Sequence, residues 1–136
     1  MVTAVHGVRA ARRGRMSESE IVADVRLALS KGDIRLFRNN TGMLQDKRGQ
    51  WVRFGLCPGS SDLIGFKSVR ITADMVDQRI AQFVAMEAKT PTGRLTDEQR
   101  AFIAMVQEHG GIAGAFRSLW AAKNLLGVDV GKEEGK

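Results

Sequence analysis

Three residues of the chain have types and positions that suit metal-assisted chemistry: Asp62, Glu87 and Lys89. Side chains two positions apart on a strand share a face. Glu87 and Lys89 therefore lie on one face at the end of the apolar stretch that begins at Ile80. Asp62 follows the glycine- and serine-containing loop 57–61, which lets a ligand approach the backbone closely. If the two segments are neighbouring strands, two carboxylates and one ammonium group converge at one point.

Two carboxylates held close together repel each other unless a hard cation neutralises them, and oxygen ligands favour Mg²⁺ or Mn²⁺. Such an ion polarises a phosphate and lowers the pKa of a bound water. A neighbouring lysine orients that water and offsets the charge of the transition state. The residues therefore predict metal-assisted hydrolysis of a phosphodiester. The plain alternatives are a solvated loop aspartate at Asp62 and an exposed pair at Glu87 and Lys89.

The segments around these residues resemble the VRR-NUC family, the virus-type replication-repair nucleases of the PD-(D/E)XK superfamily. Residues 59–65 (GSSDLIG), residues 86–96 (MEAKTPTGRLT), Gln99 and Phe102 carry the resemblance. It extends over nearly the whole part of the chain that is expected to fold. A bare D…ExK triplet arises by chance, whereas the continuous run with a GSSD loop upstream is much more specific.

The resemblance implies an α/β fold with a PD-(D/E)XK, restriction-endonuclease-like core. In that core a central mixed β-sheet is flanked by helices in the order α-β-β-β-α-β. It also implies a structure-specific endodeoxyribonuclease for DNA repair that uses Mg²⁺ or Mn²⁺, cleaves branched or Holliday-junction-like DNA and works as a homodimer. The alternatives are a restriction-like nuclease, an RNA-directed nuclease and a module that binds branched DNA without cutting it.

The family also implies roles for individual residues. Asp62 and Glu87 hold the metal together with the carbonyl of Ala88, and Lys89 assists the attacking water. Gln99 corresponds to a family glutamine near the active lysine, and it is also the expected capping-box partner of a threonine three positions earlier. One side chain can serve both purposes.

The superfamily usually supplies a further glutamate from its first helix, and two residues of this chain compete for that role. Glu20 is the expected capping-box partner of Ser17. Glu18 lies on the helical stripe of Ile21 and Val25, which faces the sheet. The pattern favours Glu18, with Glu20 as the alternative.

Contacts with DNA are predicted less sharply, because solvated turn residues explain the same pattern equally well. The candidates are Arg38, Asn39, Asn40, Ser60 and Arg94. Trp51 has the chemistry to stack on a base, although packing within a hairpin is the favoured role.

Apolar periodicity and turn residues indicate the elements that position these groups. The predicted helices cover 17–31, 96 to the glycines at 110–111, and 118–126, with a helical turn in 73–79. The predicted strands cover 34–37, 62–66, 80–89 and 112–117. Turns are predicted at 39–42 and 46–49, and a hairpin between 43 and 54. The strand over 80–89 is apolar on both faces, which is typical of a buried central strand. The order predicts helices packed around one sheet.

Length and composition limit the possible classes of protein. The chain has 136 residues, 43% hydrophobic and 26% charged, which is typical of one ordinary globular domain. We expect a mobile basic extension over 1–16, the nuclease domain over 17–126 and a flexible tail over 127–136. The formal net charge is +6, of which the four arginines of 1–16 supply most. A uniformly basic, histone-like binder is therefore excluded.

A single cysteine, Cys57, excludes an intrachain disulfide framework and cannot form a zinc site alone. No apolar run approaches the ~18–20 residues that span a membrane. The N-terminal arginines are not followed by the apolar stretch of a secretory signal. We therefore expect no association with a membrane and, with the family resemblance, the cytoplasm of a bacterial or phage-infected cell.

Overall fold

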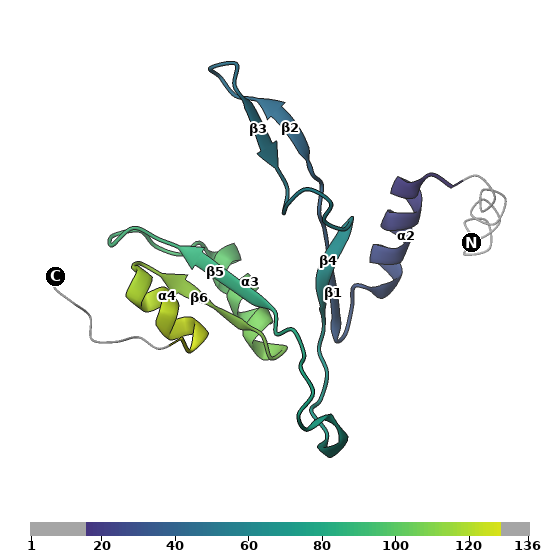
Figure 1. Ribbon diagram of the computed structural model, residues 1–136, viewed down its shortest axis with the longest axis vertical. Helices are drawn as coiled ribbons and strands as arrows, with labels where there is room; N and C mark the ends of the chain where they lie inside the picture. Colours follow the sequence, from purple (N-terminus) through teal and green to yellow (C-terminus); the bar gives the residue numbers. More distant parts are fainter. Residues whose placement is uncertain (1–15, 129–136) are drawn as a thin grey trace. The chain divides into compact units, whose positions relative to one another are not determined.

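The computed structural model describes residues 16–128, which belong to two compact units, one up to Lys67 and the other from Ser68 onward (Figure 1). The predicted extension over 1–16 and tail over 127–136 lie almost entirely outside the described residues. Within this part of the chain, no helix has the length and apolar character needed to cross a membrane.

The first unit begins with helix α2 (Glu18–Leu29), which starts at the predicted capping box. The hydroxyl of Ser17 accepts a hydrogen bond from Glu20 N (3.2 Å), and the Glu20 carboxylate accepts one from Ser17 N (2.8 Å). This reciprocal cap satisfies two of the N–H groups that a helix start leaves open. The helix ends before the predicted residue 31, because Ser30 leaves the helical conformation and its hydroxyl accepts from Leu36 N (2.8 Å).

Strands β1 (Ile34–Arg38) and β4 (Leu63–Lys67) form the antiparallel pair on which α2 packs through its contacts with β1. The two backbones approach each other closely at Gly65. A Cβ atom at this position would lie 1.8 Å from the carbonyl oxygen of Arg35, so only glycine fits. Both strands were predicted, and each extends one residue beyond its predicted end.

The predicted hairpin is present as strands β2 (Gly42–Gln45) and β3 (Trp51–Phe54), which form a separate two-stranded sheet within the first unit (Figure 1). The glycine that was predicted to end the preceding turn is instead the first residue of β2. The hairpin turn is held by Asp46, whose carboxylate accepts hydrogen bonds from Arg48 N (2.8 Å) and Gln50 N (2.9 Å).

The second unit is built on a parallel pair, β5 (Val84–Ala88) and β6 (Ile112–Phe116). Helix α3 (Asp97–Glu108) connects the two strands and contacts both of them, and helix α4 (Leu119–Leu126) contacts β6 (Figure 1). A parallel pair requires a crossover connection of this kind. The most deeply buried apolar residues are Val106 of α3 and Ala113 of β6.

The prediction of a long, buried strand over 80–89 is wrong in both respects. Of these residues only Val84–Ala88 form a strand, and Ile80 is 56% exposed. The partner strand sets this limit, because β6 begins at Ile112, after the turn at Gly110. An apolar stretch forms a strand only where a second strand supplies hydrogen-bond partners.

The α/β class is confirmed, whereas the single central mixed sheet is not found in the described residues. Residues 16–128 form three two-stranded sheets, β1–β4, β2–β3 and β5–β6. The elements follow in the order α2, β1, β2, β3, β4, η2, β5, α3, β6, α4, where the predicted helical turn is the 3₁₀ helix η2 (Ala73–Met75). Beside η2, the Thr72 hydroxyl donates to the Asp74 carboxylate and lowers the pKa of that group.

Candidate functional site

The first unit contains a small pocket between the start of α2 and the end of β1. Its lining residues are Glu18, Ser19, Val22, Arg38, Asn40 and Asp62. We call it the Asp62 pocket. Two acidic residues, one asparagine and one arginine are thus among the residues that line this cavity of about 70 Å³, which has room for several water molecules. The structure therefore brings Asp62 together with the favoured glutamate of the first helix.

The two glutamates of α2 have different roles because they lie at different positions of the first turn. Glu20 is occupied by the capping box, and Glu18 lines the Asp62 pocket. Residues two positions apart on a helix point in nearly opposite directions. The placement agrees with the preference for Glu18, whose part in catalysis stays a prediction.

Asn39 holds the loop that carries Asp62. Its Nδ2 donates to Ser60 Oγ (2.7 Å) and to the carbonyl of Ser61 (2.9 Å), and its Oδ1 accepts from Leu56 N (3.1 Å). The backbone N–H of Asn39 also donates to the carbonyl of Asp62 (2.8 Å). These bonds give Asn39 and Ser60 structural roles, and their predicted contacts with DNA remain predictions.

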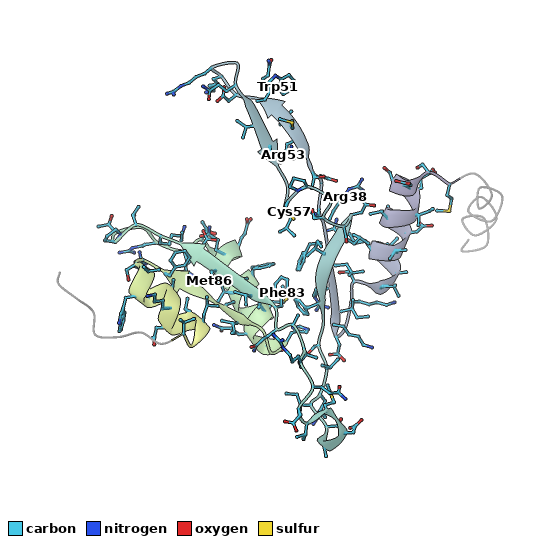
Figure 2. The ribbon with its side chains drawn as sticks, viewed as in Figure 1. Arg38, Trp51, Arg53, Cys57, Phe83 and Met86 are labelled. Carbon is cyan, nitrogen blue, oxygen red and sulfur yellow. The ribbon has the colours of Figure 1, made fainter. Side chains whose placement is uncertain are left out.

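The other predicted DNA contacts occupy two different places. Arg38, at the end of β1 in Figure 2, donates from Nε to Asn40 Oδ1 (2.8 Å), and both residues line the Asp62 pocket. The Arg38 guanidinium therefore offsets part of the negative charge of the pocket. Arg94 is exposed in the loop before α3, within the second unit.

The second unit contains the pair of residues that the sequence placed on one face of a strand. Glu87 Oε1 lies 3.7 Å from Lys89 Nζ and accepts a hydrogen bond from Gln99 Nε2 (2.7 Å). The side chains of Lys89 and Glu87 are 18% and 36% exposed, so the pair is partly desolvated. Partial burial strengthens the Coulomb attraction between the two charges, compared with a fully solvated pair. Ala88, the predicted carbonyl ligand, is the last residue of β5.

Gln99 performs two functions with the two ends of its amide. Its Oε1 accepts from Thr96 N (3.0 Å) and completes the capping box of α3, while its Nε2 holds Glu87. The neighbour that Gln99 contacts is thus the Glu87 carboxylate, whose Oε1 lies 3.7 Å from Lys89 Nζ. The chemistry explains this outcome, because an amide N–H needs an acceptor and an ammonium group offers only donors.

Sequence reasoning missed Arg117, which holds the loop directly after Lys89. The Arg117 guanidinium donates to the carbonyls of Thr90 and Gly93, the latter at 2.8 Å. The parallel register pairs Ala88 with Phe116, which brings Arg117 to this loop. Only the strand pairing could have revealed the contact, since the partners are more than twenty residues apart in the chain.

A groove beside Glu87 adds two further residues that sequence reasoning did not single out as site residues. Glu98 and Phe102 of α3 line it together with Glu87 and Gln99. Within the described ranges of the two units, no three His, Cys, Asp or Glu side chains form a metal-binding group. The first unit has Glu18 and Asp62 at its pocket, and the second unit, by itself, has the Glu87–Lys89 pair.

Comparison with known proteins yields one match. A family model described as the VRR-NUC domain matches residues 19–120, about three quarters of the chain. The matched segment contains Asp62, Glu87, Lys89 and Gln99 and starts directly after Glu18. No curated protein and no solved structure matches the chain.

Proposed function

The chain belongs to the VRR-NUC family of nucleases, and from this premise we propose that it is an Mg²⁺- or Mn²⁺-dependent endodeoxyribonuclease with a PD-(D/E)XK core. The observation that supports the proposal most strongly is the partly buried Glu87–Lys89 pair, held by Gln99 inside the matched segment. Membership of a nuclease family implies an interaction with DNA. The metal, the type of cut and the preferred DNA structure are the parts that we propose.

The chemical types of the acidic residues suit a hard divalent cation. Glu18 and Asp62 line one pocket, and both contacts that Glu87 makes among the described residues fall on Oε1, which leaves Oε2 for a ligand. Sets of oxygen donors favour Mg²⁺ and Mn²⁺. We propose that Asp62, Glu87 and the Ala88 carbonyl hold the ion, with Glu18 in support. When bound, the ion would supply positive charge to the phosphate being cleaved.

The remaining groups orient the attacking water, offset negative charge and hold the site residues in place. Lys89 would hold the attacking water by a hydrogen bond and offset negative charge on the phosphate as the new bond forms. Gln99 fixes the Glu87 carboxylate from one side, and Arg117 holds the loop that follows Lys89. Fixed partners of this kind keep reacting groups in a productive geometry. The products would be a 5′-phosphate and a 3′-hydroxyl.

We propose branched, Holliday-junction-like DNA as the substrate and a homodimer as the active species. Each chain carries one Glu87–Lys89 pair and therefore makes one cut. Resolution of a four-way junction needs two cuts on opposite sides of the junction. A two-fold symmetric pair of chains supplies two identical sites placed opposite each other.

Cleavage of a panel of labelled substrates tests this proposal. We expect cuts in four-way DNA with Mg²⁺ or Mn²⁺, weaker cutting of flapped, splayed and linear DNA, and no cuts when EDTA is present. Cleavage confined to RNA or to one linear sequence would replace the proposed substrate. Binding without any cleavage, in either metal, would show a non-cleaving DNA-binding module and overturn the proposed activity.

Gln99→Glu separates the two functions of Gln99. Glutamate serves at this position of a capping box, so the free energy of unfolding should change by less than about 1 kcal/mol. The variant loses the N–H that holds Glu87 and places a second carboxylate beside it. We therefore expect kcat to fall by roughly tenfold or more, which is about 1.4 kcal/mol in the barrier.

Ala101→Glu is the matched control for this variant, because it adds the same charge at an exposed position of α3. We expect its cleavage rate and melting temperature to stay close to the wild-type values. A Gln99→Glu protein that cleaves at the wild-type rate would contradict the positioning role of Gln99.

A further inference from the structure

The β2–β3 hairpin is the part of the first unit that the proposed chemistry does not use. Its register places Met43 opposite Arg53 and Gln45 opposite Trp51, and the intervening pairs point to the other side of the ribbon. The two faces therefore differ in chemistry. The apolar face consists of Gly42, Leu44, Val52 and Phe54, and the polar face consists of Met43, Gln45, Trp51 and Arg53.

The hairpin is strongly basic for its size. Lys47 and Arg48 lie in its turn and Arg53 on its polar face, whereas Asp46 is its single acid. The Asp46 carboxylate already accepts two backbone N–H groups of the turn. Across residues 16–128, none of the three basic side chains forms an ion pair. The hairpin thus presents uncompensated positive charge to solvent.

An aromatic side chain accompanies this charge. Trp51 is 64% exposed and lies next to the turn, while Arg53 lies closer to the base of the ribbon (Figure 2). An exposed indole can stack on an unpaired base, and a cationic side chain can bind the phosphates beside it. Cations, an indole and the Gln45 amide together form the set of groups that nucleic acids bind.

The base of the hairpin is held beside the Asp62 pocket. Gly55 (φ 90°) follows β3, and a Cβ there would lie 2.6 Å from the carbonyl oxygen of Asn40. The next residue, Leu56, donates its N–H to Asn39 Oδ1 (3.1 Å). Asn40 lines the pocket that contains Asp62. A polyanion bound along the ribbon would therefore extend toward that pocket.

We propose that the β2–β3 hairpin is a DNA-binding arm, whose turn and polar face contact the substrate at a distance from the cleaved phosphodiester. The proposal rests on the proposed function, because it takes DNA as the substrate. A two-stranded ribbon fits the major groove of a duplex. Lys47, Arg48 and Arg53 bind phosphates, and Trp51 stacks on a base that is unpaired at a branch point. Charge favours this occupant over the hairpin of a second copy, because that hairpin carries the same positive charge and would be repelled.

Anisotropy of a labelled four-way DNA, measured with EDTA to prevent cleavage, tests the role of the cations. Each duplex phosphate contact releases about 0.9 counterion, which sets the slope of the logarithm of the binding constant against the logarithm of the salt concentration. The triple variant Lys47→Gln/Arg48→Gln/Arg53→Gln should therefore reduce the magnitude of this slope by about 2.7. At about 0.1 M salt we expect binding at least tenfold weaker than wild type. The control is Lys31→Gln, an exposed cation in the loop that precedes β1, and its slope should not change.

Tryptophan fluorescence provides a second readout that does not depend on the charge variants. The chain has two tryptophans, so Trp120→Phe leaves Trp51 as the single emitter and Trp51→Phe leaves Trp120. We expect four-way DNA to quench the emission of Trp51 and to leave that of Trp120 unchanged.

The outcomes distinguish the arm from the proposed function. If the wild-type protein binds and cleaves DNA and the triple variant has the same affinity and slope, only the proposal of a DNA-binding arm is overturned. Trp51 emission that depends on protein concentration and not on DNA would assign the hairpin to contacts between copies of the chain. A wild-type protein that does not bind DNA would overturn both proposals.

Discussion

Glu87→Gln and Asp62→Asn are each expected to reduce cleavage by roughly 100-fold or more, while binding to DNA in EDTA stays equal or tightens. Each substitution keeps the shape of the side chain and removes the charge that we assign to the metal. Binding should improve because a carboxylate near a phosphate repels it. Single-turnover cleavage with Mn²⁺, measured beside anisotropy, separates the two effects.

The controls for these variants are Asp97→Asn and Glu108→Gln, which make the same chemical changes at the two ends of α3. Asp97 forms an exposed ion pair with Arg100 (3.0 Å), so its loss costs little stability. Both controls should cleave at nearly the wild-type rate. Residual cleavage above about a tenth of wild type in either site variant would contradict the assigned ligands.

Glu18→Gln should slow cleavage by about tenfold or more, whereas Glu20→Gln should stay within about twofold of wild type. Glu18 lines the same pocket as Asp62 and is proposed to support the metal site. Glu20 caps α2, and glutamine performs the same capping function at that position. The two variants change the same charge within one helical turn, so each serves as the control for the other.

Steady-state cleavage rates and thermal unfolding check this prediction together. Similar unfolding curves for the two variants would show that a difference in rate arises at the site. Equal cleavage by Glu18→Gln and wild type would remove Glu18 from the site, and a slower Glu20→Gln would transfer the role to Glu20.

Features that depend on residues close together in the chain could be predicted from the sequence. The capping boxes of Ser17 with Glu20 and of Thr96 with Gln99 connect positions three residues apart, and both are present. Glu87 and Lys89 share a face because the period of a strand is two. The hairpin followed from the turn at residues 46–49. In each case the local backbone geometry determines the contact.

Features that depend on strand pairing were decided only by the tertiary structure. The strand predicted over 80–89 is limited to Val84–Ala88 because its partner begins at Ile112. The same register brings Arg117 to the loop after Lys89, a contact that no local pattern predicts.

Long-range packing also decided which polar groups meet. Glu18 lines the Asp62 pocket, and Gln99 holds the carboxylate of Glu87. The sequence by itself determined which helices are capped and which residue types could bind a metal. It did not determine their neighbours, because the partner of a side chain depends on how segments distant in the chain pack together.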